Sequence, residues 1–271
     1  MSLHVVMFSG GIGSWAAARR VAIEHGTDGL VLLFADVKGN NPSPHAGEDE
    51  DTYRFIKDAA AQVGGELITL NEGRDIWQVF KDRNFLGNSR IANCSAELKQ
   101  KPARTWLDAN CDPEETTVYV GIDWSESHRL PAIERNYLPY VAKAPLTQPP
   151  YLSKQQMFDM AEAVGLTIPR AYRWGMSHNN CGGGCVHAGQ AQFATLLRVH
   201  PERYAYWEQQ EQGVRDHLGR DDVAILKQTT NGVATPITLR AFREQITRQP
   251  SMFDEFDVGG CGCFVQDEDN S

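Results

Sequence analysis

The 271-residue sequence has no long apolar segment and an excess of negative charge. No apolar run approaches the roughly 20 residues that a transmembrane helix needs, so we expect no membrane contact. A basic leader with a small-residue cleavage site is also missing, so we expect no signal peptide and a cytoplasmic protein. With 26 Lys and Arg against 35 Asp and Glu, the net charge is −9. This balance excludes a broad electrostatic grip on nucleic acid, although it leaves room for a local basic groove.

Two common phosphate-binding motifs are absent from the loop Ser9-Gly10-Gly11-Ile12-Gly13-Ser14. It lacks the Gly-Lys-Ser/Thr of the Walker motif, and its glycine spacing differs from the dinucleotide fingerprint. The loop still lies between an expected strand and an expected helix. There, glycines leave backbone N–H groups open and the positive helix end attracts anions. We therefore expect Ser9, Gly10, Gly11, Gly13 and Ser14 to bind phosphate; the alternative is a tight turn with incidental glycines.

Strand-like and helix-like segments alternate in the first half of the chain. Apolar runs predict strands at 5–8, 29–34, 66–70 and 116–122, and apolar periodicity predicts helices at 14–24, 52–63 and 102–109. Repeated β-α-β units predict an α/β fold with a doubly wound parallel sheet, whose ligands bind at the carboxyl ends of the strands.

The pattern changes after Pro149-Pro150. Helical periodicity then dominates, with an N-cap at Ser153, a glycine- and cysteine-rich loop at 175–189 and one short strand pair within 223–237. We predict a nucleotide-binding domain over 1–150 and a mostly helical, cysteine-bearing C-terminal region over 151–271.

Six cysteines occur, at positions 94, 111, 181, 185, 261 and 263. In a reducing cytoplasm they serve more often as metal ligands, catalytic thiols or buried apolar residues than as disulfides. Cys181 and Cys185 flank three glycines that let the backbone wrap around a bulky ligand, and Cys261-Gly262-Cys263 repeats the theme. Zinc and a [4Fe–4S] cluster both accept four thiolates, so the spacing leaves both open. We interpret Cys111 as structural.

Further segments carry recognisable motifs. Asp36 ends the second expected strand, and Asp-Thr-Tyr-Arg-Phe-Ile at 51–56 opens the next helix. Residues 94–102 contain Cys-x-x-x-Leu-Lys-x-x-Pro, residues 121–129 end in Glu-Ser-His-Arg, and residues 172–185 contain Tyr-Arg-Trp-Gly and a cysteine pair. Together with the Ser-Gly-Gly-x-x-Ser loop, these segments resemble the PP-loop superfamily of adenine-nucleotide α-hydrolases. Within it they are most similar to phosphoadenosine-phosphosulfate (PAPS) reductase-like proteins, over about residues 5–190.

The resemblance implies ATP or PAPS as the nucleotide. Asp36 would contact a ribose or coordinate Mg²⁺, or else cap the next turn. Arg129 offers a planar fork and Lys99 a point charge, which suit phosphates in any family. The alternative for both cations is a weak surface ion pair. We assign Arg129 to nucleotide binding and Lys99 to catalysis.

The resemblance also favours a [4Fe–4S] cluster over zinc. In the related adenylyl-sulfate reductases, cluster cysteines precede the Lys-x-x-Pro element and recur in a C-terminal pair, which correspond here to Cys94 and to Cys181 with Cys185. Those reductases have an adjacent Cys-Cys pair where this sequence has Cys94 alone. A fourth ligand must then come from Cys261 or Cys263, or the cluster has three protein ligands. We assign Cys263 to the metal and Cys261 to catalysis; the alternative is the reverse assignment.

Three functions follow from these motifs. The first is an ATP pyrophosphatase and sulfurtransferase that adenylates an acceptor and delivers sulfur from a cysteine desulfurase or thioredoxin-like donor, with a nucleic acid among the candidate acceptors. The second is a sulfonucleotide reductase, which the absence of a C-terminal Glu-Cys-Gly-Leu-His string disfavours. The third is a non-catalytic partner subunit that binds nucleotide and cluster.

Overall fold

The computed structural model describes residues 2–86, 92–230 and 232–248. Its main sheet has five parallel strands in the order β3-β2-β1-β4-β5. They are β1 (Leu3–Met7), β2 (Leu30–Asp36), β3 (Glu66–Asn71), β4 (Thr116–Tyr119) and β5 (Val141–Lys143). This order confirms the predicted doubly wound α/β fold. The strand order reverses between β1 and β4, where such sheets bind ligands.

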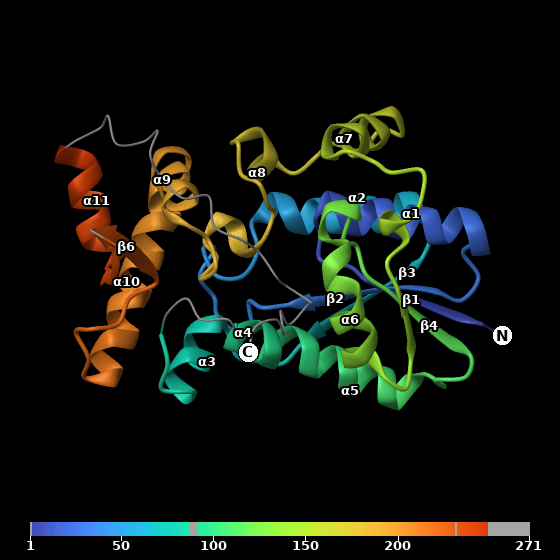
Figure 1. Ribbon diagram of the computed structural model, residues 1–271, viewed down its shortest axis with the longest axis horizontal. Coiled ribbons are helices and arrows are strands. Elements are labelled where there is room, and N and C mark those ends of the chain that lie inside the picture. The colour runs from blue at the N-terminus through green and yellow to red at the C-terminus, as the bar shows by residue number, and fades with distance from the viewer. Residues whose placement is uncertain (1, 87–91, 231, 249–271) are drawn as a thin grey trace.

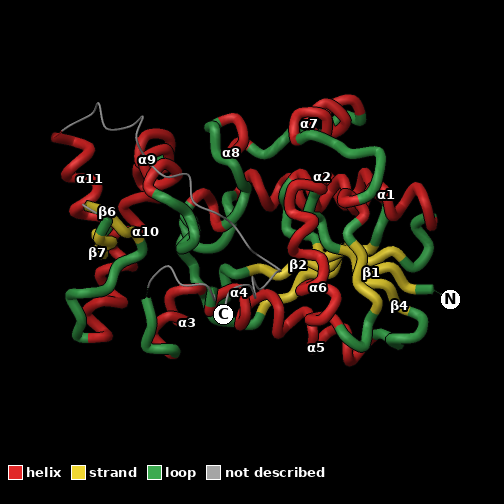
Figure 2. The backbone as a smooth tube through the Cα atoms, viewed as in Figure 1, coloured by secondary structure: helices red, strands yellow, loops and turns green. Residues whose placement is uncertain are grey.

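Helices cover both faces of this sheet (Figures 1 and 2). Apolar side chains of α1 (Ile12–His25), α2 (Glu50–Val63) and α7 (Lys154–Ala163) pack with Val6, Phe8 and Leu32 on one face. Those of α5 (Lys101–Asn110) and α6 (Leu130–Tyr137) pack with Val5, Met7 and Leu33 on the other. Successive residues of β1 therefore point into opposite cores, which explains the apolar run Val5-Val6-Met7 in the second part of the strand.

A third apolar cluster contains most of the C-terminal region. It joins α9 (Gln190–Val199), α10 (Pro201–Leu218), α11 (Leu239–Arg248) and the antiparallel hairpin of β6 (Leu226–Thr230) and β7 (Val233–Ile237) to α3 (Ile76–Asp82). The hairpin confirms the expected strand pair. Elements before and after residue 150 pack on each other: α7 packs on α1, and α10 packs on α3. The division into domains at that residue stays a prediction.

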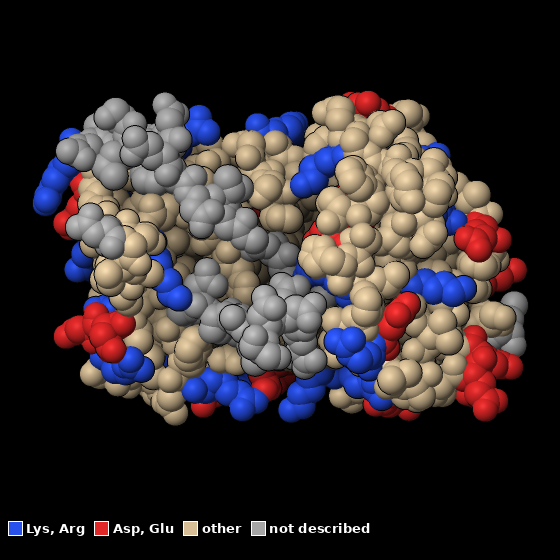
Figure 3. All heavy atoms as spheres, in the orientation of Figure 1, with Lys and Arg blue, Asp and Glu red and all other residues tan. Residues whose placement is uncertain are grey.

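Shorter elements connect these layers. They are α4 (Asn93–Ser95), a π-helical segment at Ala96–Gln100, α8 (Arg170–Arg173), and 3₁₀ turns at Trp124–Arg129, Pro145–Thr147 and Cys181–Gly183. Across the described residues, no helix combines the length and the hydropathy needed to cross a bilayer. Positive and negative side chains are intermixed along the lower edge of the face in Figure 3.

The side chain of Arg203 fastens α10 to the loop that leads into α2. Its guanidinium donates hydrogen bonds to the carbonyl oxygens of His45, Gly47 and Glu48, at 3.0–3.3 Å. It also forms an ion pair with Asp49 at 3.3 Å, and both side chains are at least 98% buried. Burial lowers the pKa of Arg203, an effect that Asp49 opposes. A guanidinium charge that is buried this deeply is stable only when all of these partners are in place.

We predict that Arg203→Met lowers the free energy of unfolding by about 3 kcal/mol, because it removes the buried cation of the Asp49 carboxylate and leaves it paired with the partly exposed Arg170. Urea denaturation measures the change. The exposed Arg198 on the adjacent α9 is the matched control, and Arg198→Met is expected to change stability by less than about 0.5 kcal/mol. Equal effects of the two substitutions would contradict the role assigned to Arg203.

Candidate functional site

A cavity of about 570 Å³ opens at the carboxyl ends of β1 and β4. We call it the nucleotide cavity, after the ligand that the sequence predicts for this end of the sheet. Its wall comes from the loop after β1, the segment after β4, the start of α7, and the segment between α8 and α9. The lining residues that matter below are Ser9, Gly11, Gly13, Ser14, Gly121, Asp123, Glu126, His128, Arg129, Lys154, Tyr172, Ser177, His178, Asn179, Asn180 and His187. The cavity therefore lies where the strand order predicts a ligand site.

Glycines let the first turn of α1 and the segment after β4 touch. A Cβ added to Gly13 would lie 2.7 Å from the carbonyl oxygen of Gly121, and one added to Gly121 would lie 2.8 Å from the Cα of Ser14. Gly10 adopts a φ of +79°, which favours glycine. The loop is thus shaped by backbone contacts that no larger residue would allow.

The first turn of α1 faces the nucleotide cavity. Gly11 precedes the helix with extended backbone and supplies no side-chain cap. The Ile12 N–H donates to the Tyr172 hydroxyl at 3.1 Å, and the Ser14 hydroxyl donates to the Gly11 carbonyl at 2.8 Å. A helix N-terminus without a side-chain cap, opening into a polar cavity, is suited to bind an anion.

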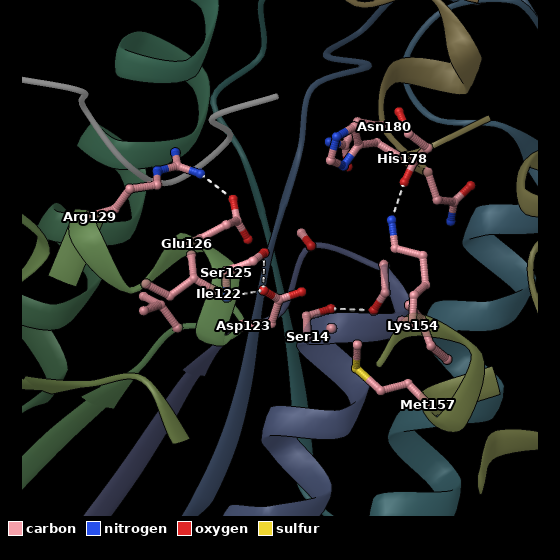
Figure 4. Close-up of a pocket in the computed structure, with 18 of the residues that line it drawn as sticks. Ser14, Ile122, Asp123, Ser125, Glu126, Arg129, Lys154, Met157, His178 and Asn180 are labelled. Carbon is pink, nitrogen blue, oxygen red and sulfur yellow. Dashed lines mark hydrogen bonds and ion pairs between the residues drawn. The ribbon is translucent and has the colours of Figure 1, made fainter. Parts of the chain in front are cut away.

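Charged side chains flank this helix end on opposite sides (Figure 4). Arg129, which is 8% exposed, pairs with Glu126 at 2.5 Å. Across the cavity, the Lys154 ammonium donates to the Ser177 carbonyl at 2.6 Å. The Asp123 carboxylate accepts bonds from the Ser125 N–H and hydroxyl, which fixes the turn that carries Arg129. Two cations across one cavity are suited to a polyanion in an acidic protein.

His178 adds a neutral imidazole to the same wall. Burial lowers its pKa, Lys154 and Arg129 lower it further, and Glu126 opposes them. The ring is therefore uncharged at neutral pH, and can both donate and accept a hydrogen bond.

Asn179 links the glycine loop to the segment that carries the cysteines. Its amide donates to the Gly10 carbonyl at 2.9 Å and accepts a bond from the Thr52 hydroxyl at 2.8 Å. The residue is 2% exposed. Buried amide bonds of this kind fix geometry because leaving them unmade costs energy.

The predicted nucleotide ligands separate into two groups. Ser9, Gly11, Gly13, Ser14 and Arg129 line the nucleotide cavity, and Gly10 supports it through the bond from Asn179. Asp36 does not line it. Its carboxylate accepts bonds from the Tyr53 hydroxyl at 2.6 Å and the Lys38 N–H at 3.0 Å, as expected if it caps the turn after β2. The role of Asp36 toward a nucleotide stays a prediction.

A second, smaller cavity, here the cysteine cavity, brings the other predicted residues together. Its wall includes Cys94, Cys181, Cys185, Lys99 and His187. The π-helical segment carries Lys99, and such segments often occur at functional sites. Residues 94, 99, 181 and 185 thus converge, although about 80 positions separate the two halves of the set. Lys99 does not line the nucleotide cavity.

A buried carboxylate faces Lys99. The Glu48 carboxylate lies 3.7 Å from the Lys99 ammonium, and both side chains are at least 95% buried. Burial raises the pKa of Glu48, whereas Lys99 and Arg203 oppose the rise. Lys99 is therefore part of an internal ion pair and not a surface cation, which removes the weak-pair alternative for it.

The cysteine cavity offers part of a metal site. Thiolates suit iron–sulfur clusters and zinc, and three cysteines line one space. Within the described residues, however, no three His, Cys, Asp or Glu side chains are grouped closely enough to hold a metal ion. Cys261 and Cys263 lie outside those residues. The thiols are of the right chemical kind, but their described positions do not form a metal site, so the cluster stays a prediction. Cys111 is half-buried against an apolar cluster, and burial raises its pKa, in keeping with a structural role.

Several residues of the nucleotide cavity were not predicted as ligands from the sequence. Lys154 directly follows the N-cap Ser153, and nothing in the local pattern indicates that it reaches a cavity. Gly121 and Tyr172 were noted only within family motifs. Tyr172 contacts the helix start from 160 positions away. A close backbone approach is the physical reason for the glycine in Gly-Ile-Asp at 121–123.

We predict that Gly13→Ala weakens ATP binding at least about tenfold, because the methyl group forces β4 away from the first turn of α1. Isothermal titration calorimetry measures the affinity. Gly213→Ala, within α10 and with open space around the added methyl group, is the control and is expected to leave binding unchanged. Unaltered affinity in Gly13→Ala would place the phosphates elsewhere.

Comparisons with known proteins add the following. No protein-family model matches the sequence, and no curated protein matches it. Among solved structures, the chain is similar to the phosphate complex of a phosphoadenylyl-sulfate (PAPS) reductase from Candida auris, with a TM-score of 0.42 and 14% sequence identity. The similar region covers 65% of this chain and 80% of that chain.

Proposed function

We propose that this chain is an adenine-nucleotide-dependent enzyme that adenylates an acceptor and then replaces the AMP with sulfur. The observation that carries the proposal is the pair of neighbouring cavities. One holds a helix N-terminus whose N-cap glycine supplies no side-chain bond and which two cations flank, and the other is lined by three cysteines. His187 lines both. Phosphate activation and thiol chemistry would then take place side by side.

The nucleotide cavity would bind the phosphates of ATP. The first turn of α1 offers backbone donors, and Arg129 and Lys154 offer positive charge on either side. Asp123 and Glu126 are the carboxylates among the lining residues, and they would hold a Mg²⁺ that enters with ATP. Each group acts on charge that develops as pyrophosphate leaves.

In the first step, an oxygen of the acceptor attacks the α-phosphorus, and the bond to the β-phosphate oxygen breaks. Adenylated acceptor and pyrophosphate form. In the second step, the terminal sulfur of a cysteine persulfide attacks the activated carbon and AMP leaves. A second thiolate then breaks the S–S bond between acceptor and cysteine, so that the acceptor thiol leaves and a cystine remains. A cysteine desulfurase would supply the persulfide, and a thioredoxin-like protein would reduce the cystine. Cys261, outside the described residues, stays the predicted thiol.

A cluster would use the cysteine cavity. Cys94, Cys181 and Cys185 would hold it, with Cys263 from outside the described residues as the fourth ligand. When bound, a [4Fe–4S] cluster would supply soft-metal chemistry toward sulfur. Lys99 lines the same space, and it would place a positive charge next to the thiolates.

The second candidate is a sulfonucleotide reductase, which the same pair of cavities favours. A thiolate would attack the sulfate sulfur of PAPS, the S–O bond to the nucleotide would break, and sulfite would leave after a second thiol attack.

We expect Arg129→Met to weaken ATP binding about tenfold, since it removes a fork of phosphate donors. Calorimetry measures binding, and exchange of labelled pyrophosphate into ATP in the presence of acceptor-containing cell extract measures the first step. Arg220→Met, at a solvent-exposed ion pair beside the hairpin, is the control and should bind ATP normally. Release of sulfite from PAPS with thioredoxin, without pyrophosphate exchange, would favour the reductase instead.

Anaerobic purification should give a brown protein with about four iron and four sulfide per chain. Cys94→Ser and Cys181→Ser should lose most of the iron, because each removes a ligand from the cysteine cavity. Cys111→Ser should keep the iron, since Cys111 packs against the core below the sheet. A colourless protein with one zinc would contradict the cluster assignment.

A further inference from the structure

His187 occupies a position that none of the motifs above explains. Of all the described residues that line either cavity, it alone lines both. Chain connectivity agrees, because Asn180 lines the nucleotide cavity and its neighbour Cys181 lines the cysteine cavity. The partition between the two spaces is therefore thin, and His187 is part of it.

The backbone around His187 is fixed against the cysteines. Its N–H donates to the Cys185 sulfur at 3.5 Å, and the Ala188 N–H donates to the Cys185 carbonyl at 2.8 Å. His187 as a whole residue is partly buried, its Nε2 atom is fully buried, and Val186 and Ala188 on either side are buried.

The glycines before His187 are equally constrained. A Cβ on Gly182 would lie 1.9 Å from the Arg203 guanidinium, and one on Gly184 would lie 2.4 Å from the Trp207 ring. Because the loop is packed on both sides, it has little freedom to move. A change at the partition must therefore come from the side chain of His187 and not from the loop.

We propose that the His187 ring is a positioning residue at the passage between the two cavities, and that it controls access from the nucleotide cavity to Cys181 and Cys185. The inference rests on the proposed function for its purpose, since sulfur must travel between a cysteine and the activated acceptor. The position of His187 between the two cavities does not depend on that function. The ring limits the size of what reaches the sulfur atoms, and a nucleotide bound in front of it covers the same opening.

The experiment measures access to the cysteine cavity in the wild type, His187→Ala and His187→Phe, using protein as purified. Where iron is absent, iodoacetamide labelling of Cys181 and Cys185 is followed by mass spectrometry. Where iron is present, its loss to a water-soluble chelator is followed instead. His128→Ala is the matched control, because His128 lines the nucleotide cavity alone. Each protein is tested with and without saturating ATP.

We expect His187→Ala to raise the access rate about tenfold and His187→Phe to lower it, with His128→Ala unchanged. ATP should slow access in the wild type and slow it less in His187→Ala. A role in stability alone would raise access in both His187 variants, so a rise in both, or no change in either, overturns the proposal. Calorimetry on the same samples separates the two claims. If ATP does not bind, the proposed function fails, while the opposite effects of Ala and Phe still test the passage.

Discussion

One buried amide, that of Asn179, joins the two halves of the candidate site. It donates to the carbonyl of Gly10 in the glycine loop and accepts a bond from Thr52 on α2. Two residues later in the chain, Cys181 enters the cysteine cavity. The nucleotide cavity and the cysteine cavity are therefore set relative to each other by a single short segment. Losing either hydrogen bond would leave a buried polar group unpaired, so this geometry is strongly specified.

The charges that shape the candidate site act locally and do not follow the net charge of the chain. A chain of net charge −9 still presents Arg129 and Lys154 on opposite sides of one helix N-terminus. Deeper inside, Glu48 lies between Lys99 and Arg203, and Arg203 in turn fixes the loop before α2. Such buried charges are kept only with partners in place. The same network therefore supports the cysteine cavity and fastens α10 to the first half of the chain.

Continuous apolar runs made β1 and β2 predictable, because a strand buried on both faces has few polar residues. β5 was missed: it has three residues, and Val141 is exposed, which leaves no periodic signal. α3 was missed because it is short, although its Asp75–Gln78 capping box was a usable sign. The glycine loop could be predicted from local sequence. Asn179 could be expected to anchor the cysteine-bearing loop, as it does through Gly10 and Thr52. Lys154 could not be predicted, since it reaches the site only through the tertiary packing of α7.

Hydrogen exchange measured by mass spectrometry, with and without saturating ATP, tests most directly that the helix start after β1 is the nucleotide site. Bound ATP should slow exchange in peptides covering residues 9–16 and 121–129 and leave the hairpin at 226–237 unchanged. Slower exchange confined to other segments, or none at an ATP concentration shown to saturate binding, would contradict it.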